Sequence, residues 1–400
     1  MPEDAYSGPP RLGLCMIVKN ESKVIRRALE SAKPYIDTWV ISDTGSTDDT
    51  ISIIKETMAG VPGEVFERPW VNFGANRTEA FELCRGRMEW AIVIDADDSL
   101  VFKSKPPVAL WQKSPYDGFR IEICHGTLRH YRPHVFRIRK DASLWCYRGT
   151  LHEYAELASG KPANLGETRC VSLIARTEGA RSQDPRKYEN DAAFLERELA
   201  RAPGEPRTQF YLAQSYLHAG KLAQARENYE RRLALDGGYV EEKYICHVEL
   251  TKLYNHDAER QIQHALRSIE QEPTRLEGAF QLLRARRQRH AAFDTRTYAI
   301  GLLASVLADV PREVPTNKLF VLPDVYKLEF DDEFAISALL SGHADEGLVA
   351  ARRALAAAPP DHPMYPRLLS NVHFAESDAS KMIEADAAED AEAAIEAARR

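Results

Sequence analysis

Short apolar runs alternate with helical stretches from Leu12 to about Leu100, and this alternation limits the fold more than any other feature of the chain. In order, the segments are LCMIV, SKVIRRALESA, TWVIS, DDTISIIKETM, EVFE, RTEAFELC and WAIVI. Strands that alternate with helices in this way form a doubly wound, mainly parallel sheet. The first run has no polar alternation, as expected of a strand that is covered on both faces. We therefore expect an N-terminal α/β domain.

Polar residues follow three of the expected strands. Lys19, Asn20 and Glu21 follow the first strand, residues 43–46 follow the second, and residues 95–98 follow the fourth. In open sheets of this kind, ligands bind outside the carboxyl ends of the strands. We therefore expect the three clusters to share one crevice.

Helical periodicity replaces the strand pattern after about Pro185. The change predicts a domain boundary near residues 178–186, which gives a sheet domain at 1–180 and an all-α domain at 181–400. Small and aromatic residues between 207 and 235 fall where a tetratricopeptide repeat (TPR) places its packing residues. They are Ala213, Tyr216, Gly220, Ala225 and Tyr229. A weaker match consists of Ala335, Gly342, Ala354 and Pro359. We expect a TPR-like bundle or short solenoid.

The charge balance argues against a nucleic-acid partner. The chain has 53 Lys and Arg against 60 Asp and Glu, a net charge of −7, and so lacks an overall cationic field. Six scattered cysteines without a CxxC pair indicate reduced thiols. The first residues do not resemble a signal peptide, and no run of about 18 apolar residues could span a membrane. We expect a cytoplasmic protein with no transmembrane segment.

The segment WAIVIDADDSL brings Asp95, Asp97 and Asp98 to the end of an apolar strand. Residues two apart on an extended chain point to the same side, so Asp95 and Asp97 could share one ligand. Carboxylate oxygens suit Mg²⁺ or Mn²⁺, which bridge carboxylates to nucleotide phosphates. The alternative is that these residues only cap the following turn, a common role of Asp. Three carboxylates at one strand end favour the metal site.

A second polar segment, TWVISDTGSTDDT, places Asp43 at a strand end. Ser46 and Asp49 are spaced as a capping box that would open the next helix. Asp43 could instead accept a hydrogen bond from a base or ribose, as acidic residues do in nucleotide crevices. We favour the nucleotide role, with capping as the alternative.

Four arginines, Arg129, Arg132, Arg137 and Arg139, alternate with His130, Tyr131 and His134. This basic run could bind a diphosphate or an anionic acceptor. It could equally be the outward face of an ordinary strand.

The order of these motifs is specific. LCMIVKNE, VISDTGSTDDT, FGANRTEAFELC and WAIVIDADD resemble the motif series of family 2 glycosyltransferases with the GT-A fold. The segment RPHVFRIRKDASLWCYRGTLHE is similar to one found in a subgroup of these enzymes that also carries a TPR-like C-terminal region. The resemblance thus implies a GT-A-like domain followed by a TPR-like domain.

The resemblance also implies roles for individual residues. Asp43 would contact the uracil or ribose, and the backbone around Val18, with Glu21, would line the nucleoside pocket. Arg77 would steady the donor, although a surface arginine paired with a glutamate is the alternative. Residues 95–97 would meet the diphosphate: Asp95 and Ala96 bind the nucleotide sugar, and Asp95 and Asp97 hold the metal.

The pair His152 and Glu153 resembles the His-Glu motif of the same family. A histidine near two aspartates can be a further metal ligand, and a glutamate can take a proton from an acceptor. We expect His152 to bind the metal and Glu153 to be the general base. The alternative is a hydrogen-bonded pair within a core. Asp98 is a second choice as metal ligand, and Asp141 or Glu122 as base.

The implied reaction is an inverting transfer of a sugar from a nucleoside-diphosphate sugar, expected to be a UDP-sugar, to a saccharide or to a protein or peptide. The first rival, a nucleotidyltransferase, usually has a Gly-rich loop after the first strand, whereas no glycine lies between that strand and Gly45. The second rival is a nucleotide-sugar-binding scaffold or protein-interaction module with an inactive transferase domain. The helical domain could recruit an acceptor, act as a brace or form a homo-oligomer.

Overall fold

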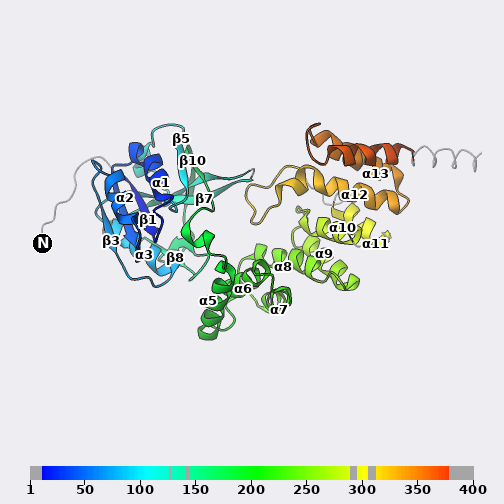
Figure 1. Cartoon of the computed structure of the whole chain (residues 1–400), viewed down its shortest axis with the longest axis horizontal. Helices are drawn as coiled ribbons and strands as arrows, with labels where there is room; N and C mark the ends of the chain where they lie inside the picture. The colour runs from blue at the N-terminus through cyan, green and yellow to red at the C-terminus, as the bar shows by residue number, and fades with distance from the viewer. Residues whose placement is uncertain (1–10, 127, 141–143, 289–294, 305–311, 378–400) are drawn as a thin grey trace, which may run out of the picture. The chain divides into compact units, whose positions relative to one another are not determined.

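The computed structural model describes residues 11–126, 128–140, 144–288, 295–304 and 312–377 (Figure 1). The chain divides into two compact units, residues 1–221 and 222–400. The expected boundary at residue 180 falls just after the last strand, whereas this division keeps the next two helices with the sheet. Asp141, a second choice for the general base, lies outside the described residues.

An eight-stranded mixed sheet forms the first unit, in the order β3-β2-β1-β4-β7-β6-β10-β5, and β8 and β9 form a separate ribbon. The strands are β1 (Leu12–Val18), β2 (Thr38–Asp43), β3 (Gly63–Glu67), β4 (Trp90–Val93), β5 (Ser99–Phe102), β6 (Gly118–His125), β7 (Leu128–Arg137), β8 (Trp145–Arg148), β9 (Tyr154–Leu157) and β10 (Leu165–Ile174). The strands β3, β2, β1 and β4 run parallel, whereas β7 is antiparallel to both β4 and β6. The α/β, doubly wound prediction is confirmed, with an antiparallel extension beyond β4.

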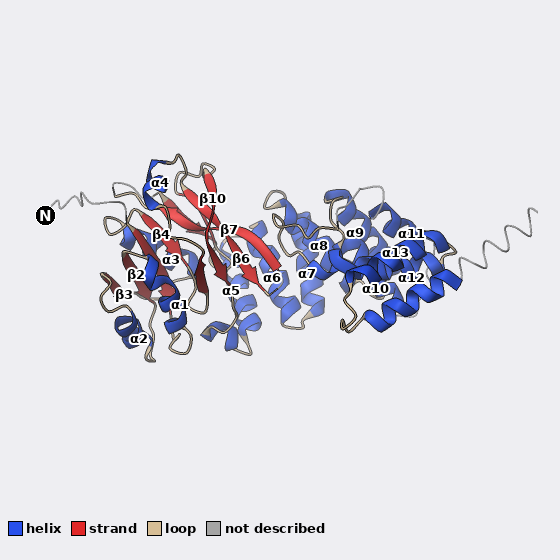
Figure 2. Cartoon of the chain, turned by 90° about the horizontal axis from the view of Figure 1, so that it is seen from above, coloured by secondary structure: helices blue, strands red, loops and turns tan. Residues whose placement is uncertain are grey.

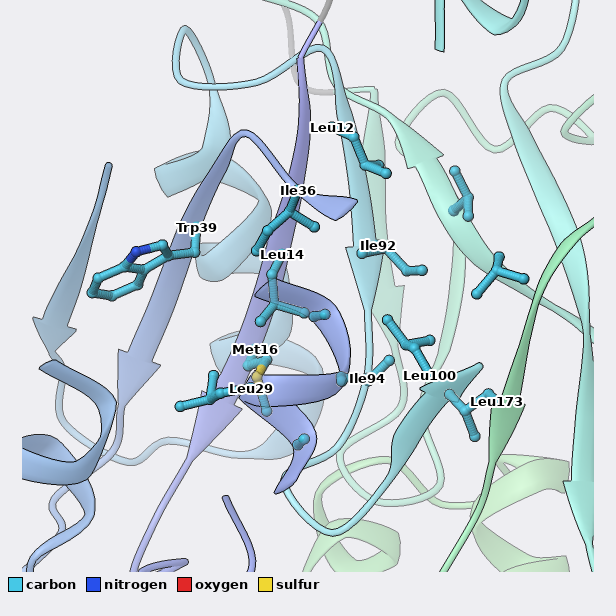
Figure 3. Packing of buried hydrophobic residues seen from close by; sticks show 14 of the residues in the cluster. Leu12, Leu14, Met16, Leu29, Ile36, Trp39, Ile92, Ile94, Leu100 and Leu173 are labelled. Atoms are coloured by element: carbon cyan, nitrogen blue, oxygen red, sulfur yellow. The ribbon is translucent and has the colours of Figure 1, made fainter. Parts of the chain in front are cut away.

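Helices cover both faces of the parallel strands. They are α1 (Ile25–Ala32), α2 (Thr50–Thr57), α3 (Phe73–Cys84) and the short α4 (Val108–Lys113), with a 3-10 turn at Lys33–Tyr35. Leu14 and Met16 of β1 pack against Leu29 of α1 on one face, as Figure 3 shows. Cys15, on the opposite face, packs with Phe81 of α3. Burial on both faces explains why β1 is a continuous apolar run.

The register aligns the carboxyl ends of the strands that precede the polar clusters. Val18 of β1 is paired with Asp43 of β2, and Cys15 is paired with Val93 of β4. The residues that follow β1, β2 and β4 therefore emerge at the same edge of the sheet.

Helices, blue in Figure 2, and the loops that connect them make up the rest of the described chain. In the first unit a 3-10 turn (Ala180–Gln183) leads to α5 (Lys187–Arg201) and α6 (Pro206–His218). The second unit contains α7 (Leu222–Ala234), α8 (Val240–Leu253), α9 (Ala258–Gln271), α10 (Glu277–Gln288), α11 (Thr295–Leu302), the π-helical turn Val325–Glu329, α12 (Phe330–Leu340) and α13 (Ala344–Ala357). No helix among the described residues has the length and apolar character needed to cross a bilayer.

The residues that match the TPR frame occupy packing positions. Ala213, Ala225 and Tyr229 are fully buried, and Tyr216 is nearly so. Gly220 follows α6 with a φ of +73°, a left-handed conformation that glycine adopts at little cost. Near the end of the chain, Ala335 and Ala354 are buried in the paired helices α12 and α13. The TPR-like helical prediction is confirmed.

Candidate active site

A cavity of about 530 Å³ lies at the carboxyl ends of β1, β2 and β4. All three polar clusters contribute to its wall. The lining includes the predicted site residues Val18, Glu21, Arg77, Asp95, Ala96 and Asp97, together with Thr44 from the second cluster. The crevice expected from the strand order is therefore present.

Asp43 does not line this cavity; it precedes the lining residue Thr44 in the chain and is 1% exposed. Its Oδ1 accepts hydrogen bonds from the backbone N–H groups of Gly45 (3.0 Å) and Ser46 (2.9 Å), so it caps the turn. Its Oδ2 is buried without a hydrogen-bond partner among the described residues. Because an unsatisfied buried carboxylate oxygen is costly, Asp43 has an acceptor to offer to a ligand as well as a structural role.

The capping box predicted for Ser46 and Asp49 is wrong. The Ser46 hydroxyl instead accepts a hydrogen bond from the backbone N–H of Asn20 (2.8 Å), and Asp49 makes no side-chain capping bond. Asp48 takes the capping role by accepting from the Thr50 N–H (3.1 Å). Ser46 is thus used to tie the loop after β2 to the loop after β1.

The segment after β4 forms a turn, not the extended chain expected from the sequence. The backbone N–H of Asp98 donates to the carbonyl of Asp95 (3.2 Å). Asp98 Oδ2 accepts from the Asp95 N–H (3.3 Å) and Oδ1 from the Arg176 N–H (3.3 Å), so Asp98 stabilises the turn. Asp95 and Asp97 both line the cavity, as expected. It is the turn, and not an extended strand, that places them there.

Asp97 also anchors the loop that follows β10. Its Oδ2 accepts hydrogen bonds from the backbone N–H groups of Glu178 (3.0 Å) and Gly179 (2.9 Å). Glu21 accepts from the N–H of Ala180 on the same loop (3.1 Å). This loop forms part of the cavity wall, and no local motif of the sequence pointed to it.

Carboxylates in this cavity are crowded. Burial, aided by Asp97 and Asp95, raises the pKa of Glu21 to about 7. Burial, again aided by Asp95 and Asp97, raises the pKa of Asp98 to about 7. Carboxylate oxygens are the donors that a hard divalent cation such as Mg²⁺ or Mn²⁺ prefers. Asp95 and Asp97, which line the cavity, offer donors of this type.

Arg77 joins the aspartate turn to the loop before β9. Its Nη2 lies 2.5 Å from Asp95 Oδ1 and its Nε lies 2.6 Å from Glu153 Oε1. The alternative was a surface arginine paired with a glutamate. Arg77 does pair with a glutamate, but its side chain is only 12% exposed and so does not lie on the surface. The ion pair with Arg77 lowers the pKa of Asp95.

A second cavity of about 400 Å³ adjoins the first. Both are lined by Phe73, Arg77, Asp95, Leu151 and Arg181. His152, Glu153, His134 and Arg132 line the second cavity, as do Arg207 and Tyr211 from α6. We call the two spaces the first and second cavities.

The structure does not bring His152 together with Asp97, because the two residues line different cavities. The His152 ring is stacked on Tyr211, with centroids 3.9 Å apart, and Arg207 Nη2 donates to the His152 carbonyl (2.8 Å). Burial and nearby cations, Arg181 first, lower the pKa of His152 to about 3. No group of three or more His, Cys, Asp or Glu side chains is arranged to hold a metal in the part of the chain that the structure describes.

The basic run divides into structural and cavity-lining residues. Arg137 donates to the carbonyls of Tyr116 (2.9 Å) and Ser114 (2.8 Å) and therefore braces the fold. Only Arg132 and His134 of this run line the second cavity. Glu122 of β6, a second choice for the base, pairs with Lys103 and lines neither cavity.

Comparison with known proteins identifies this part of the chain. Residues 14–155 match the model of the family described as Glycosyl transferase family 2. A TPR repeat-containing protein of Synechococcus elongatus is 34% identical over 95 residues, which cover 24% of this chain and 22% of that protein. An uncharacterized glycosyltransferase of Rickettsia felis is 33% identical over 130 residues, which cover 32% of this chain and 44% of that protein. The chain thus spans less than half the length of either relative.

Among solved structures, Staphylococcus aureus TarS 1–349 in complex with UDP-GlcNAc is similar over 71% of this chain and 93% of that chain. The identity is 14% and the TM-score is 0.37.

Proposed function

We propose, from the premise that residues 14–155 are a family 2 glycosyltransferase domain, that the chain transfers a sugar with inversion from a nucleoside-diphosphate sugar to an acceptor. One observation carries the proposal: two cavities of different composition meet at Asp95 and Arg77. The first cavity would hold the donor and the second the acceptor, so that the reacting atoms meet where the cavities join.

The first cavity suits a nucleoside diphosphate, and we propose a UDP-sugar. Its nucleoside end would lie against Val18 and Glu21, with Asp43 Oδ2 available to accept a hydrogen bond from the base or ribose. Its diphosphate end would lie at Asp95 and Ala96. In other nucleotide crevices, acidic residues accept a hydrogen bond from the ribose in the way proposed for Asp43.

Asp95 and Asp97 would hold a divalent cation at the diphosphate; His152, which lines only the second cavity, is left out of this ligand set. Arg77 binds one oxygen of Asp95 and peptide N–H groups bind one oxygen of Asp97, which leaves the other oxygen of each carboxylate for the ion. Bound there, Mg²⁺ or Mn²⁺ would offset negative charge on the departing diphosphate.

Transfer would proceed in one displacement. The acceptor hydroxyl oxygen forms a bond to the anomeric carbon while the bond from that carbon to the diphosphate oxygen breaks, and the electron pair leaves with the nucleoside diphosphate. Glu153 would take the hydroxyl proton. Arg77 holds the Glu153 carboxylate (2.6 Å) and Asp95 (2.5 Å) at the same time, so the base and the donor site would be oriented by one side chain.

The acceptor is a saccharide or a protein or peptide, and the TPR-like helices would recruit it or form a homo-oligomer. A nucleotide-sugar-binding scaffold without activity is the alternative. Transfer activity separates the two, because both would bind the donor.

Calorimetry with the full-length chain tests the donor site. With Mn²⁺, UDP should bind at least about tenfold more tightly than ADP, and Asp97→Asn should remove the dependence on Mn²⁺. Asp49→Asn is the matched control, because Asp49 is exposed, outside the cavity lining and makes no capping bond. Equal binding of UDP and ADP without any effect of Mn²⁺ would rule out the assignment. A screen of nucleotide sugars for hydrolysis and transfer then identifies the sugar.

A further inference from the structure

The second cavity is unusually cationic for this chain. Four arginines line it, Arg77, Arg132, Arg181 and Arg207, against the two carboxylates of Asp95 and Glu153. The whole chain, by contrast, has a net charge of −7. A cleft whose sign is opposite to that of the surrounding protein concentrates ligands of the complementary charge.

Arg77 and Arg181 are engaged by acidic groups of the chain itself. Arg77 binds both carboxylates of the cavity, Asp95 and Glu153. Arg181 lies 2.7 Å from Asp191. Both carboxylates that line the cavity are therefore already paired with Arg77.

Arg132 is different. It is exposed in the middle of β7, and its side chain makes neither a hydrogen bond nor an ion pair with any residue that the structure describes. His134, two residues further along β7, lines the same cavity, as the two-residue period of a strand requires. Burial is the main cause that lowers the pKa of His134 to about 4, and the charge of Arg132 adds to it. Arg132 lines the second cavity together with Asp95 and Arg77, the residues at which the two cavities meet.

The rest of the wall favours a sugar over a peptide. It is rich in aromatic rings, including Tyr147, Tyr154 and Tyr211, and Tyr211 is stacked on His152. Such rings with a few polar groups are typical of pockets for small ligands, and a cavity of about 400 Å³ is of that class. A guanidinium binds a carboxylate or phosphate through paired N–H groups.

We propose that the second cavity binds an acidic saccharide acceptor, whose carboxylate or phosphate group is held by Arg132. The inference rests on the proposed transferase function, since it names the acceptor class of that site. The anion belongs to the acceptor and not to the donor diphosphate, because Arg132 lines only the second cavity, whereas Asp97 and Glu21 line only the first.

Binding of acidic and neutral sugars to the full-length chain tests this proposal. Saturation-transfer NMR with Mg²⁺, first without UDP and then with saturating UDP, would compare glucuronate, glucose 6-phosphate and glucose. Either acidic sugar should bind at least about tenfold more tightly than glucose, since a hydrogen bond between charged groups is stronger than one between neutral groups. The two acidic sugars distinguish a carboxylate from a phosphate. Arg132→Gln should abolish the preference, and Arg132→Lys should restore part of it.

Arg129→Gln is the matched control, because Arg129 is an exposed arginine of the same strand that does not line the cavity. Three outcomes would overturn the proposal: equal binding of acidic and neutral sugars, displacement of the acidic sugars by UDP, or tighter binding of triglutamate than of either acidic sugar. UDP binding, measured separately in every variant, tests the proposed function. Acidic sugars that fail to bind to a chain that binds UDP would therefore remove only the acceptor proposal.

Discussion

The guanidinium of Arg77 lies 2.6 Å from the carboxylate of Glu153, so the candidate base is held by a charged partner that also reaches Asp95. The sequence separation is 76 residues, and the link depends on α3 and the loop before β9 packing together. Arg77 thereby connects the wall shared by the two cavities to the group expected to accept the proton.

Replacement of Glu153 tests whether it is the base. Glu153→Gln keeps the shape and a hydrogen-bond acceptor for Arg77 but removes the basic carboxylate. We expect transfer to fall by about 10²–10⁴-fold, the usual contribution of a general base, while calorimetry finds UDP binding unchanged. Glu156→Gln, on the exposed ion pair with Arg148, should leave both measurements near the wild-type values. An unchanged transfer rate in Glu153→Gln would move the role to another residue.

Replacement of Arg77 tests the link itself. Arg77→Lys keeps one charge but cannot donate to Asp95 and Glu153 through a rigid fork. The Arg77 side chain is only 12% exposed, and breaking a buried ion pair costs about 3–5 kcal/mol. Because the lysine retains part of the pairing, we expect a smaller loss of about 2–3 kcal/mol in the free energy of unfolding. Chemical denaturation measures it. Arg26→Lys, on the exposed pair with Glu56, should cost far less. Equal losses in the two variants would contradict the structural role of Arg77.

Much of the N-terminal fold was predictable because parallel strands buried on both faces are visible as local apolar runs. All four strands and the three helices expected between residues 12 and 100 are present. The donor-side residues followed from the same pattern, since topology aligns the carboxyl ends of β1, β2 and β4. The antiparallel extension beyond β4 was harder to predict, because β7 is irregular: its pairing with β6 shifts register beside Arg120.

Most of the second cavity could not be predicted from the sequence. Arg207 and Tyr211 lie in a segment whose local pattern fits a helical repeat, and nothing in that pattern indicates that they contact His152. The turn after β4 was also missed, because Asp98 creates it through bonds to two backbone N–H groups. Such bonds depend on residues far apart in the chain, Arg176 in this case.

A close approach of two backbones offers a test of how the His152 and Glu153 loop is positioned. A Cβ atom added to Gly74 in α3 would clash with the carbonyl oxygen of Gly149, and a backbone oxygen cannot move as a flexible side chain can. We expect Gly74→Ala to cost about 1–3 kcal/mol of unfolding free energy and to reduce transfer, because the loop must shift. Ala75→Ser, at an exposed position of the same helix, should change neither quantity. Wild-type stability in Gly74→Ala would show that the loop moves freely.

In the second unit, the ring nitrogens His247 Nδ1 and His264 Nδ1 lie 2.9 Å apart, and this contact predicts acid sensitivity. Burial, then His264 and nearby cations, lowers the pKa of His247 to about 4, and burial with Arg260 lowers that of His264 to about 4. Below the histidine pKa of the unfolded chain, about 6.5, the unfolded chain therefore binds more protons than the folded chain. The contribution of the two neutral histidines to the stability of the folded chain is complete above that pH and is lost as the pH falls toward 4. We expect thermal or urea unfolding to record a loss of about 3 kcal/mol for each of the two histidines across this window. His247→Gln should reduce the pH dependence of the unfolding free energy, whereas replacement of the exposed His256 should preserve it. An unaltered pH profile in His247→Gln would assign the acid sensitivity to other groups.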